Sequence, residues 1–298
     1  RLAEAGNVAS DGRPILGMDS RDLLGIVLEK GGDTMLVPAH AWTPWFSVLG
    51  SRSGFDSIEE CFGDLARHVP AIETGLSSDP PMNWRVSSLD DYRLVSFSDA
   101  HSPRTVGREA TTFEGEISWA TIAGGIRTGK GYFGTIEFFP EEGKYHLDGH
   151  RACKRRLTPD ETIAASGKCP ACGKPVTVGV QSRVEMLADR NEPIPPGTAG
   201  FVTYMVGLAE IIAEIDGCGA GTKKVAKEAE ALIAALGPEI AILTETPLED
   251  IGRAGTDVLA EAVRRLRDCR VIREAGYDGE YGRIRMFAEG EVGAAKAR

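Results

Sequence analysis

Four side chains that can bind a metal follow three short apolar runs in the first half of the chain. The runs are 35–37, 69–72 and 94–97, and the side chains that follow them are His40, Glu73, Asp99 and His101. Apolar runs of this length are typical of buried strands, and the carboxyl ends of parallel strands meet in one crevice. We therefore expect the four side chains to form a single site. Carboxylate oxygen combined with imidazole suits zinc, manganese or iron better than calcium.

The spacing Asp99-x-His101 carries most of this prediction. Side chains alternate along an extended backbone, so Asp99 and His101 point to the same face if the segment is still extended. A single histidine or aspartate after a strand is more often a loop or cap residue than a metal ligand. On the residues alone, that alternative stays open beside the shared metal site.

A second set of ligand-type residues has the spacing of a zinc knuckle. Two residues separate His150 from Cys153, and two separate Cys169 from Cys172. Pairs with this spacing bind one tetrahedral zinc ion from tight turns, and the glycine after Cys172 permits such a turn. The spacing predicts a structural zinc held by these four side chains, with His146 as a competing candidate for the imidazole ligand.

Basic residues gather around these cysteines, although the chain as a whole is acidic. A formal net charge of −10 and a pI near 5.2 argue against nucleic-acid binding across the whole surface. Between residues 144 and 183, however, there are eight Lys or Arg and three Asp or Glu. We interpret the basic residues beside the zinc ligands as contacts for phosphates, with a solvated surface as the alternative. They are Arg151, Lys154, Arg155 and Arg156.

Two aromatic segments lie where they could support binding. Trp42, Trp45 and Phe46 follow His40 directly, and they either wall a pocket or close the mouth of a barrel. Residues 275–282 form a glycine-punctuated turn with two tyrosines, at 277 and 281. This turn either stacks on a nucleic acid or packs the end of the chain.

The composition is that of a soluble globular protein. The chain has 298 residues, of which 42% are hydrophobic and 26% charged, which is enough for one to three domains. No apolar run is long enough to cross a membrane and no signal peptide opens the chain, so we expect a cytoplasmic protein. Because the first residue is arginine and not methionine, we expect the chain to begin inside a longer one.

Alternating helices and strands must position the candidate metal ligands. Helical spacing covers 20–30, with Ser20 as its N-cap, and 57–67, with Ser57 as its N-cap. Residues 131–139 are typical of a strand. Alternation of this kind predicts an α/β fold, either a parallel barrel or a doubly wound sheet.

The second half of the chain is predominantly helical. A linker rich in proline and glycine covers 192–197. Amphipathic spacing then predicts helices over 206–215, 223–236 and 257–267, the last with Asp257 as its N-cap.

One glycine-rich segment is similar to a nucleotide-binding P-loop at first sight. Residues 124–131 contain Gly-x₄-Gly-Lys, but the next position is Gly131, where magnesium binding needs a Ser or Thr hydroxyl. We interpret the segment as a loop and expect no ATP site in this chain.

Segments spread over the whole chain together resemble the endonuclease Q family. Asp99-x-His101 is similar to the last motif of the PHP (polymerase and histidinol phosphatase) phosphoesterases, and the longer runs are specific to endonuclease Q. Members of the family are often labelled UvrD-type helicases, a label that the absence of a P-loop does not support here. The segments are 38–46, 51–55, 73–81, 98–101, 134–146, 148–151, 169–173 and 276–279.

The resemblance implies three domains and a repair activity. It implies a PHP-type distorted α/β barrel over 1–140, a small zinc-binding domain over 141–190 and a helical C-terminal domain over 191–298. It also implies a hydrolase that incises damaged DNA on the 5′ side of deaminated bases (uracil, hypoxanthine and xanthine) and of abasic sites. Its cofactors would be divalent metal ions (Zn, Mn, Mg or Fe) at the PHP site and one structural Zn.

Position by position, His40, Asp99 and His101 match catalytic metal positions of the PHP motifs. Glu73 matches a motif position that serves as a ligand or as its support. PHP sites begin with an early His-x-His motif, whereas no histidine precedes His40 here. We therefore expect the amino-terminal part of the barrel to be missing from this chain, and the chain alone to be weakly active or inactive.

Two other functions remain open. The chain could be a non-catalytic DNA-binding PHP module, or an accessory part of a helicase-labelled protein, that recognises lesions without cutting them. It could also be a small-molecule phosphoesterase, although the zinc knuckle and the helical tail then lack a purpose.

Overall fold

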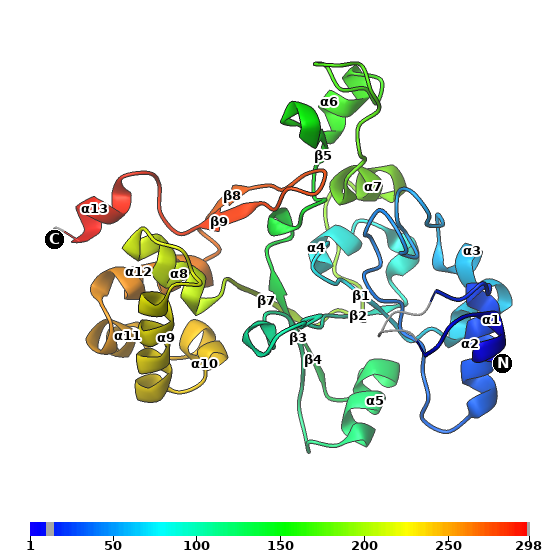
Figure 1. The fold of residues 1–298 in the computed structure, drawn as a ribbon. Helices are drawn as coiled ribbons and strands as arrows, with labels where there is room; N and C mark the ends of the chain where they lie inside the picture. Colours follow the sequence, from blue (N-terminus) through cyan, green and yellow to red (C-terminus); the bar gives the residue numbers. More distant parts are fainter. Residues whose placement is uncertain (10–14, 297–298) are drawn as a thin grey trace.

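The computed structural model describes residues 1–9 and 15–296 of the chain, without the side chains of the last three of these. Figure 1 shows an amino-terminal body in blue and cyan, a small projecting module that carries α6 (Pro159–Ala164), and a helical body in yellow and orange. A hairpin formed by β8 (Ile272–Glu274) and β9 (Arg283–Arg285) runs from the helical body toward the module. None of the described helices combines the length and the apolar character that crossing a bilayer requires.

The amino-terminal body is built from short helices around a pair of parallel strands. Its core contains Leu24, Trp42, Ile58 and Ile72, all fully buried. Its elements are α1 (Leu2–Ala5), α2 (Ser20–Lys30), α3 (Ile58–Phe62), η1 (Gly63–His68), β1 (Ala71–Glu73), α4 (Pro80–Asn83), η2 (Ser87–Leu89), β2 (Arg93–Val95), η3 (Pro103–Thr105), β3 (Ala110–Phe113), α5 (Trp119–Thr128) and β4 (Tyr132–Phe138).

Two of the three predicted strand runs are strands, and the third is not. β1 and β2 pair in parallel, with Ile72 opposite Leu94. The run 35–37 is extended but forms no strand. It still leads into the ladder, because Glu73 N–H donates to Pro38 O at 3.0 Å and Ala41 N–H donates to Glu73 O at 3.1 Å. The strand prediction was therefore wrong there, while the expected approach of the segment to β1 is present.

A second sheet joins distant parts of the chain. β3 pairs antiparallel with β4, and β4 pairs in parallel with β7 (Phe201–Met205). β7 comes from the segment predicted to be helical, so it lies beyond the expected domain boundary at residue 190. The described strands form one sheet of three strands and three sheets of two. The fold is therefore mixed α/β, and the PHP-type barrel remains a prediction.

In two helices the N-cap lies one residue before the predicted one. α2 covers the predicted 20–30, but its N-cap is Asp19, whose carboxylate accepts the N–H of Arg21. α12 (Asp257–Arg267) is likewise capped by Thr256 and not by Asp257. In both places the residue predicted as the cap already has helical geometry.

The helix predicted over 57–67 is capped by Ser57 as expected but is broken in the middle. The Ser57 hydroxyl accepts the N–H of Glu60 at 3.0 Å. At Gly63 the backbone takes a φ of 57°, which ends α3, and a 3₁₀ helix continues the path. A left-handed glycine is a common helix terminator.

The segment 124–131, predicted to be a loop, is partly helical. Its first residues form the last turn of α5, and Gly129 ends that helix with a φ of 80°. The local order is therefore helix, turn and strand β4, which is the reverse of the strand, loop and helix of a P-loop.

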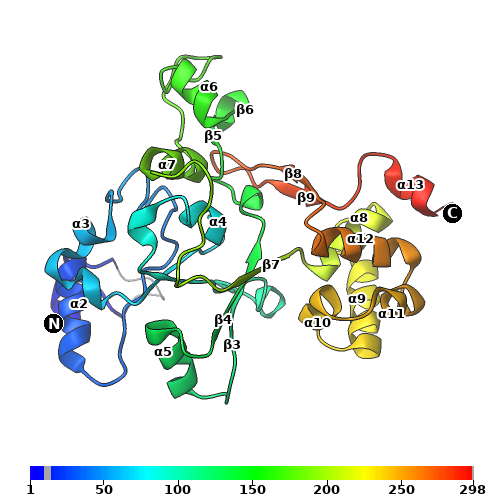
Figure 2. The ribbon, with the colours of Figure 1, turned by 180° about the vertical axis from the view of Figure 1, so that it is seen from behind.

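The helical body packs around its own apolar core, which includes Phe139, Leu208, Ile242 and Phe287. α9 has the predicted bounds, and its N-cap is Thr222, whose hydroxyl accepts a backbone N–H. Figure 2 shows the helices gathered on one side of the sheet. They are α8 (Leu208–Asp216), α9 (Lys223–Leu236), α10 (Glu239–Thr244), α11 (Leu248–Ala254), α12 and α13 (Glu291–Lys296).

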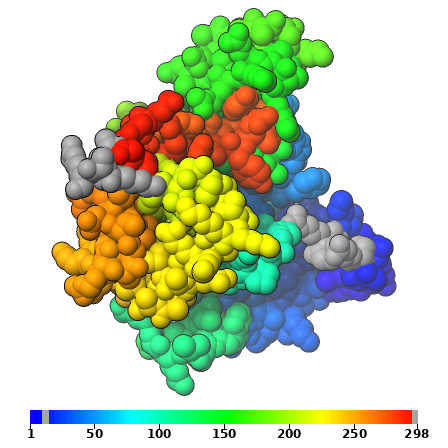
Figure 3. All heavy atoms as spheres, turned by 60° about the vertical axis from the view of Figure 1, so that its left-hand side comes forward, coloured from blue at the N-terminus to red at the C-terminus, as the bar shows by residue number. Residues whose placement is uncertain are grey.

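The projecting module and the hairpin complete the fold. α7 packs its Val180 and Val184 into the amino-terminal core and so ties the module to that body. Figure 3 shows the module in green above the hairpin in red. The elements are η4 (Pro140–Glu142), β5 (Asp148–His150), η5 (Arg151–Cys153), β6 (Arg155–Leu157), α6 (Pro159–Ala164), α7 (Val180–Leu187), β8 (Ile272–Glu274) and β9 (Arg283–Arg285).

Candidate active site

His40 stands at the centre of the candidate site because both of its ring nitrogens face a carboxylate. Its backbone N–H donates to Glu73 Oε2 at 2.8 Å, and its Nδ1 lies 3.5 Å from the same oxygen. Its Nε2 lies 3.8 Å from Asp99 Oδ2. Glu73 ends β1, and Asp99 follows β2, the parallel neighbour of β1. The structure thus brings three of the four predicted side chains together at adjacent strand ends.

His101 lies beside this group but is more exposed. Its Nδ1–H donates to the backbone carbonyl of Asp99 at 2.7 Å, and Nδ1 lies 4.0 Å from Asp99 Oδ1. A donor at Nδ1 places the lone pair of a neutral imidazole on Nε2, which is the arrangement of a metal-binding histidine. The side chain of His101 is 67% exposed, whereas that of Glu73 is 8% exposed. The site therefore opens from a buried carboxylate toward solvent.

The backbone around the site is unusual. His40 has a φ of 47° and Asp99 a φ of 44°, both in the left-handed region that non-glycine residues seldom occupy. Gly75 has a φ of 56°, and a Cβ added there would lie 2.6 Å from His40 Nδ1. Residues held in such conformations cost of order 1–3 kcal/mol each and persist only where tertiary contacts hold them. Strained backbone clustered at one cavity is typical of a functional site.

A large cavity opens over these side chains. Its volume is about 630 Å³, which is in the range of ligand-binding clefts. Three of the four candidate metal ligands line it, together with aromatic residues and basic side chains. The lining includes His40, Asp99, His101, Trp45, Arg108, Lys144, Tyr145, His146 and Tyr281.

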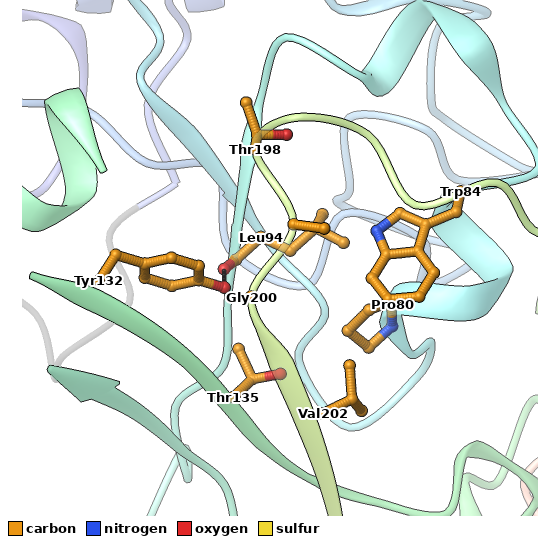
Figure 4. Close-up of a pocket in the computed structure, with 9 residues that line it drawn as sticks. Pro80, Trp84, Leu94, Tyr132, Thr135, Thr198, Gly200 and Val202 are labelled. Atoms are coloured by element: carbon orange, nitrogen blue, oxygen red, sulfur yellow. Dashed lines mark hydrogen bonds between the residues drawn. The ribbon is translucent and has the colours of Figure 1, made fainter. Parts of the chain in front are cut away.

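A second cavity, shown in Figure 4, is too small to be a binding site. It lies between Pro80, Trp84, Tyr132 and Val202, and its volume is about 10 Å³. A single water molecule needs at least roughly that volume. The Tyr132 hydroxyl donates to Leu94 O at 2.7 Å, which closes this space from the strand side. The larger cavity is therefore the better candidate for the active site.

Two buried glutamates behind the site were not predicted from the sequence. Glu137 Oε2 accepts the hydroxyls of Thr74 and Ser96 at 3.0 and 3.1 Å, and Glu109 Oε2 accepts the N–H of Leu76 at 3.0 Å. The other oxygen of each carboxyl is buried with no hydrogen-bond partner among the described residues. For Glu137 the sequence carried one signal, its place in the middle of an apolar strand, since a buried acid needs polar partners. Glu109 lies just before β3 and does not share this signal.

Burial controls the protonation of these acids. It raises the pKa of Glu109 to about 8, and it raises the pKa of Glu137 well above the ordinary value, with Glu109 adding repulsion. Burial also raises the pKa of Glu73, although the N–H of His40 partly opposes the shift. Glu109 and Glu137 therefore keep their protons to a higher pH than exposed carboxyls do.

His146 lies in the cavity and not in the cysteine cluster. It is buried, it lines the larger cavity, and its Nδ1 has no hydrogen-bond partner among the described residues. Burial lowers its pKa, which favours the neutral ring. The cluster of ligand atoms instead takes its imidazole from His150, the first choice from the sequence.

The cysteine cluster brings together four side chains that could hold a metal ion. One ligand atom from each of His150, Cys153, Cys169 and Cys172 lies within 4.8 Å of all the others. The N–H groups of Cys172 and Gly173 donate to Cys169 O at 3.3 and 2.8 Å, which forms the turn of a knuckle. Three thiols and one imidazole fit zinc, which this donor set binds tetrahedrally.

The environment of Cys169 favours its ionised form. Burial alone would raise the pKa of this thiol, but N–H donors from Ala171 and Cys172 and the neighbouring thiols lower it to about 7. The thiolate is the form that binds metal. Cys153 differs, because hydrogen bonding to the Cys172 thiol raises its pKa to about 11.

The four predicted DNA contacts are exposed, but two of them also have partners inside the chain. Arg151 Nε donates to Glu280 Oε1 at 2.8 Å, and Arg156 Nη1 donates to Ala275 O at 2.9 Å. Lys154 and Arg155 are exposed on the module. The basic cluster therefore divides into two side chains that hold the hairpin and two on the outer surface.

Comparison with known proteins gives the family. Residues 207–270 match the family model described as the MJ0043 C-terminal domain. The chain is 32% identical over 253 residues to the uncharacterized protein MJ0043 of Methanocaldococcus jannaschii, covering 82% of this chain and 31% of that protein. It is 29% identical over 263 residues to the uncharacterized protein YqxK of Bacillus subtilis, covering 87% of this chain and 62% of that protein. The chain thus spans less than two thirds of each of these relatives.

Two solved structures extend the similarity over almost the whole chain. One is the lesion-specific endonuclease PfuEndoQ from Pyrococcus furiosus, with a TM-score of 0.85 and 30% identity, covering 97% of this chain and 73% of that one. The other is endonuclease Q in complex with a 27-mer duplex substrate that has an abasic lesion at the active site. It has a TM-score of 0.86 and 30% identity, and the match covers 98% of this chain and 72% of that one. The chain belongs to the endonuclease Q family.

Proposed function

We propose that the protein is a metal-dependent DNA endonuclease that incises on the 5′ side of deaminated bases and of abasic sites. The deaminated bases are uracil, hypoxanthine and xanthine. The observation that carries the proposal is the convergence of His40, Glu73 and Asp99 beside a cavity of about 630 Å³, in a family whose solved members act on DNA lesions.

Each of these side chains has a role in this proposal. Asp99 Oδ2 and His40 Nε2, 3.8 Å apart, provide oxygen and nitrogen ligands for one cation between them, and His101 adds a second imidazole. Glu73 is a ligand or holds the backbone of His40 in place through the 2.8 Å hydrogen bond. Divalent ions at such a site (Zn, Mn, Mg or Fe) supply an activated water and charge stabilisation for phosphodiester hydrolysis.

The rest of the cavity would bind the damaged strand. Enzymes that act at a damaged base extrude it from the duplex, and mispaired bases cost less to extrude. Trp45 and Tyr145, in edge contact at 5.3 Å, and the exposed Tyr281 provide aromatic surfaces for such a base. Arg108 and Lys144 on the cavity wall provide positive charge for its phosphates.

The other parts of the chain have supporting roles in this proposal. The cysteine cluster holds one structural zinc, and Lys154 and Arg155 beside it contact the DNA backbone. The division into a partial PHP-type domain over 1–140, a zinc-binding domain over 141–190 and a helical domain over 191–298 is proposed on the same basis, as is a cytoplasmic location.

Replacement of Asp99 tests the proposal. Made in a longer protein that also supplies an amino-terminal His-x-His segment, the Asp99→Ala variant should bind a uracil-containing duplex within about threefold of the unsubstituted protein and should cut it at least about a thousandfold more slowly in Mn²⁺. The measurement is incision of an end-labelled duplex, with binding followed by fluorescence anisotropy. Asp91→Ala, on the loop before β2, is the matched control and should cut normally. Cleavage by Asp99→Ala at the wild-type rate would refute the assignment.

A second function, lesion binding without incision, is favoured by one observation. In residues 1–9 and 15–296, the group of three or more ligand-type side chains whose atoms all lie within 4.8 Å is the cysteine cluster, and not the set around His40. Unchanged DNA affinity after removal of divalent ions would establish this alternative if, in addition, none of the four metals supports incision when a segment with the early His-x-His motif is joined to the chain.

A further inference from the structure

The hairpin tip, residues 275–282, packs against the segment 144–149, which leads from the cavity to the cysteine cluster. Leu147 N–H donates to Gly276 O at 2.9 Å, and Gly279 N–H donates to Lys144 O at 2.8 Å. A Cβ added at Gly149 would lie 2.3 Å from the ring of Tyr277, so this ring packs directly against the backbone of Gly149. Figure 1 shows the hairpin from β8 to β9 extending to this place.

Two segments of the module, 150–153 and 169–177, carry the ligands of the cysteine cluster, and we call them its arms. Asp278 connects the hairpin tip to both arms. Its Oδ2 accepts the backbone N–H of Arg151 at 2.6 Å, and its Oδ1 accepts the hydroxyl of Thr177 at 2.6 Å. Arg151 lies between two predicted zinc ligands, His150 and Cys153. Thr177 lies after the other two ligands, and its N–H donates to Gly149 O at 2.8 Å. The Asp278 carboxylate can therefore keep both hydrogen bonds only while the two arms keep their relative position.

The other side of the hairpin tip forms part of the cavity rim. Tyr281 is 74% exposed and lines the cavity that His40 and Asp99 also line. Lys144 Nζ lies 5.9 Å from the centre of the Tyr281 ring and 5.5 Å from that of Tyr145. Contacts of a cation with aromatic rings at this distance are favourable but weak at exposed sites. The position of the rim therefore depends mainly on the backbone contacts of the tip.

The module is too small to hold its own shape without a metal. Its apolar core among the described residues consists of Leu157, Cys169 and Val176, with Cys153 packed against it. Cores of this size do not stabilise a fold alone, and structural zinc commonly supplies the missing free energy. Loss of the metal would release the two arms from each other.

We propose that the cysteine cluster is a clamp for the cavity rim. Metal binding fixes the two arms of the module, the arms hold Asp278, and Asp278 holds the hairpin tip that places Tyr281 and Lys144 at the cavity. Arg151 and Asp278 are positioning residues in this arrangement and touch no reacting atom. The proposal concerns the link between the module and the rim, so it is independent of the reaction that the cavity performs.

Hydrogen exchange measured by mass spectrometry tests the first step. The zinc-loaded chain is compared with the same chain after chelation by 1,10-phenanthroline, and again after zinc is restored. Exchange in 144–149 and 275–282 should become at least about tenfold faster on chelation, together with exchange in the module, and should recover with zinc. α9 and α12 in the helical body are the internal controls. Faster exchange confined to 150–177, with the hairpin tip still protected, would overturn the proposal.

Two substitutions of Asp278 test the second step with zinc in place. Asp278 has a φ of 42°, which glycine and asparagine both tolerate. Asp278→Gly keeps the backbone conformation but removes both acceptors. Asp278→Asn keeps one acceptor for the N–H of Arg151, and its amide can donate to the Thr177 hydroxyl.

The two variants should therefore differ at the hairpin tip and agree in zinc content. Exchange in 275–282 should be at least about tenfold faster in Asp278→Gly than in the wild type, and within about threefold of the wild type in Asp278→Asn. Zinc content, measured by mass spectrometry of the metal, should equal that of the wild type in both. A glycine variant with wild-type exchange at the tip, or an asparagine variant as fast as the glycine variant, contradicts the proposed contact.

Discussion

The two candidate metal sites of this chain differ in how they are built. The cysteine cluster comes from residues 150–172 alone, and its four ligand atoms lie within 4.8 Å of one another. The site around His40 takes side chains from three separate segments, with ring-to-carboxylate distances of 3.5 and 3.8 Å. The first set of donors can surround an ion completely, whereas the second lies beside a cavity. This difference is the one between structural metal sites, which are closed, and catalytic sites, which keep an open position.

The two sites also differ in the size of the apolar core beside them, and here the open site has the larger one. The site around His40 lies on a core with many fully buried side chains, among them Trp42 and Ile72. Apart from its own Cys169, the cysteine cluster lies on two buried apolar residues, Leu157 and Val176. The fold can therefore hold the open site together without a metal, whereas the closed site must hold its own module together. The comparison predicts that the same change, loss of a ligand, has unequal consequences at the two places.

The largest expected effect is that of Cys169→Ala. Cys169 is almost fully buried and is the best-supported thiolate of the cluster, so its loss should abolish stable zinc binding and unfold the module. Zinc affinity should fall at least about a thousandfold, because structural zinc binding in such modules is coupled to folding. Competition with a chromogenic chelator measures the affinity.

Two controls sharpen this prediction. Cys269→Ala removes an exposed thiol that lies outside the cluster and should leave zinc affinity unchanged. Asp99→Ala removes a ligand candidate from the open site and should leave the melting temperature within a few degrees of the wild type. A Cys169→Ala protein that retains tight zinc would mean that the module holds its metal by other residues.

The same difference explains what the sequence could predict. The cysteine spacing is local, so a knuckle could be recognised before any fold was known, and the ligand atoms do lie together. From the residues alone, the proximity of His40 to Asp99 was expected only from the rule that the carboxyl ends of parallel strands meet. The strand expected before His40 is absent. The resemblance to endonuclease Q, on motifs such as 134–146, was confirmed by the comparisons.

Other features of the site could not be predicted because they depend on the fold. Glu109 comes just before β3 and Glu137 lies within β4, and only their packing behind the site shows that both are buried. Arg151 and Arg156 were interpreted as DNA contacts, since nothing local shows that the hairpin lies within reach of them. The barrel, the domain boundaries and the roles of the individual site residues remain predictions.

An intermediate effect is expected from Glu137→Gln, through the pH dependence of stability. Burial raises the folded-state pKa of Glu137 and Glu109 above the unfolded value, so the folded protein binds more protons than the unfolded chain above about pH 4.5. The free energy of unfolding should therefore fall as the pH rises from about 5 to 8. Glutamine keeps an acceptor for the hydroxyls of Thr74 and Ser96 and removes the repulsion from Glu109. The variant should be about 2 kcal/mol more stable than the wild type at pH 8 and equal to it at pH 5.

Urea unfolding at pH 5, 6.5 and 8, with zinc present throughout, measures this difference. The cysteine cluster should respond in the opposite direction, since its thiols must lose protons to bind zinc and its affinity rises with pH. A wild-type protein whose stability increases between pH 5 and 8 at saturating zinc would show that the buried glutamates are ionised in the folded state.

The smallest effect separates the two halves of the basic cluster. Lys154→Ala and Arg155→Ala remove charges from the outer edge of the module, and each should weaken DNA binding by about three- to tenfold at low salt. Each should also reduce the slope of log K against log salt by about one, the change expected for one lost phosphate contact. Arg156→Ala should change that slope less, because its guanidinium already donates to Ala275 O in the hairpin.

Lys30→Ala, at the exposed end of α2, is the matched control for a change of one charge in an acidic protein. Anisotropy titrations of an undamaged duplex at several salt concentrations give all four slopes. Equal slopes for Lys154→Ala and Lys30→Ala would mean that the module supports the cavity rim without contacting DNA, and would leave zinc with a purely internal role.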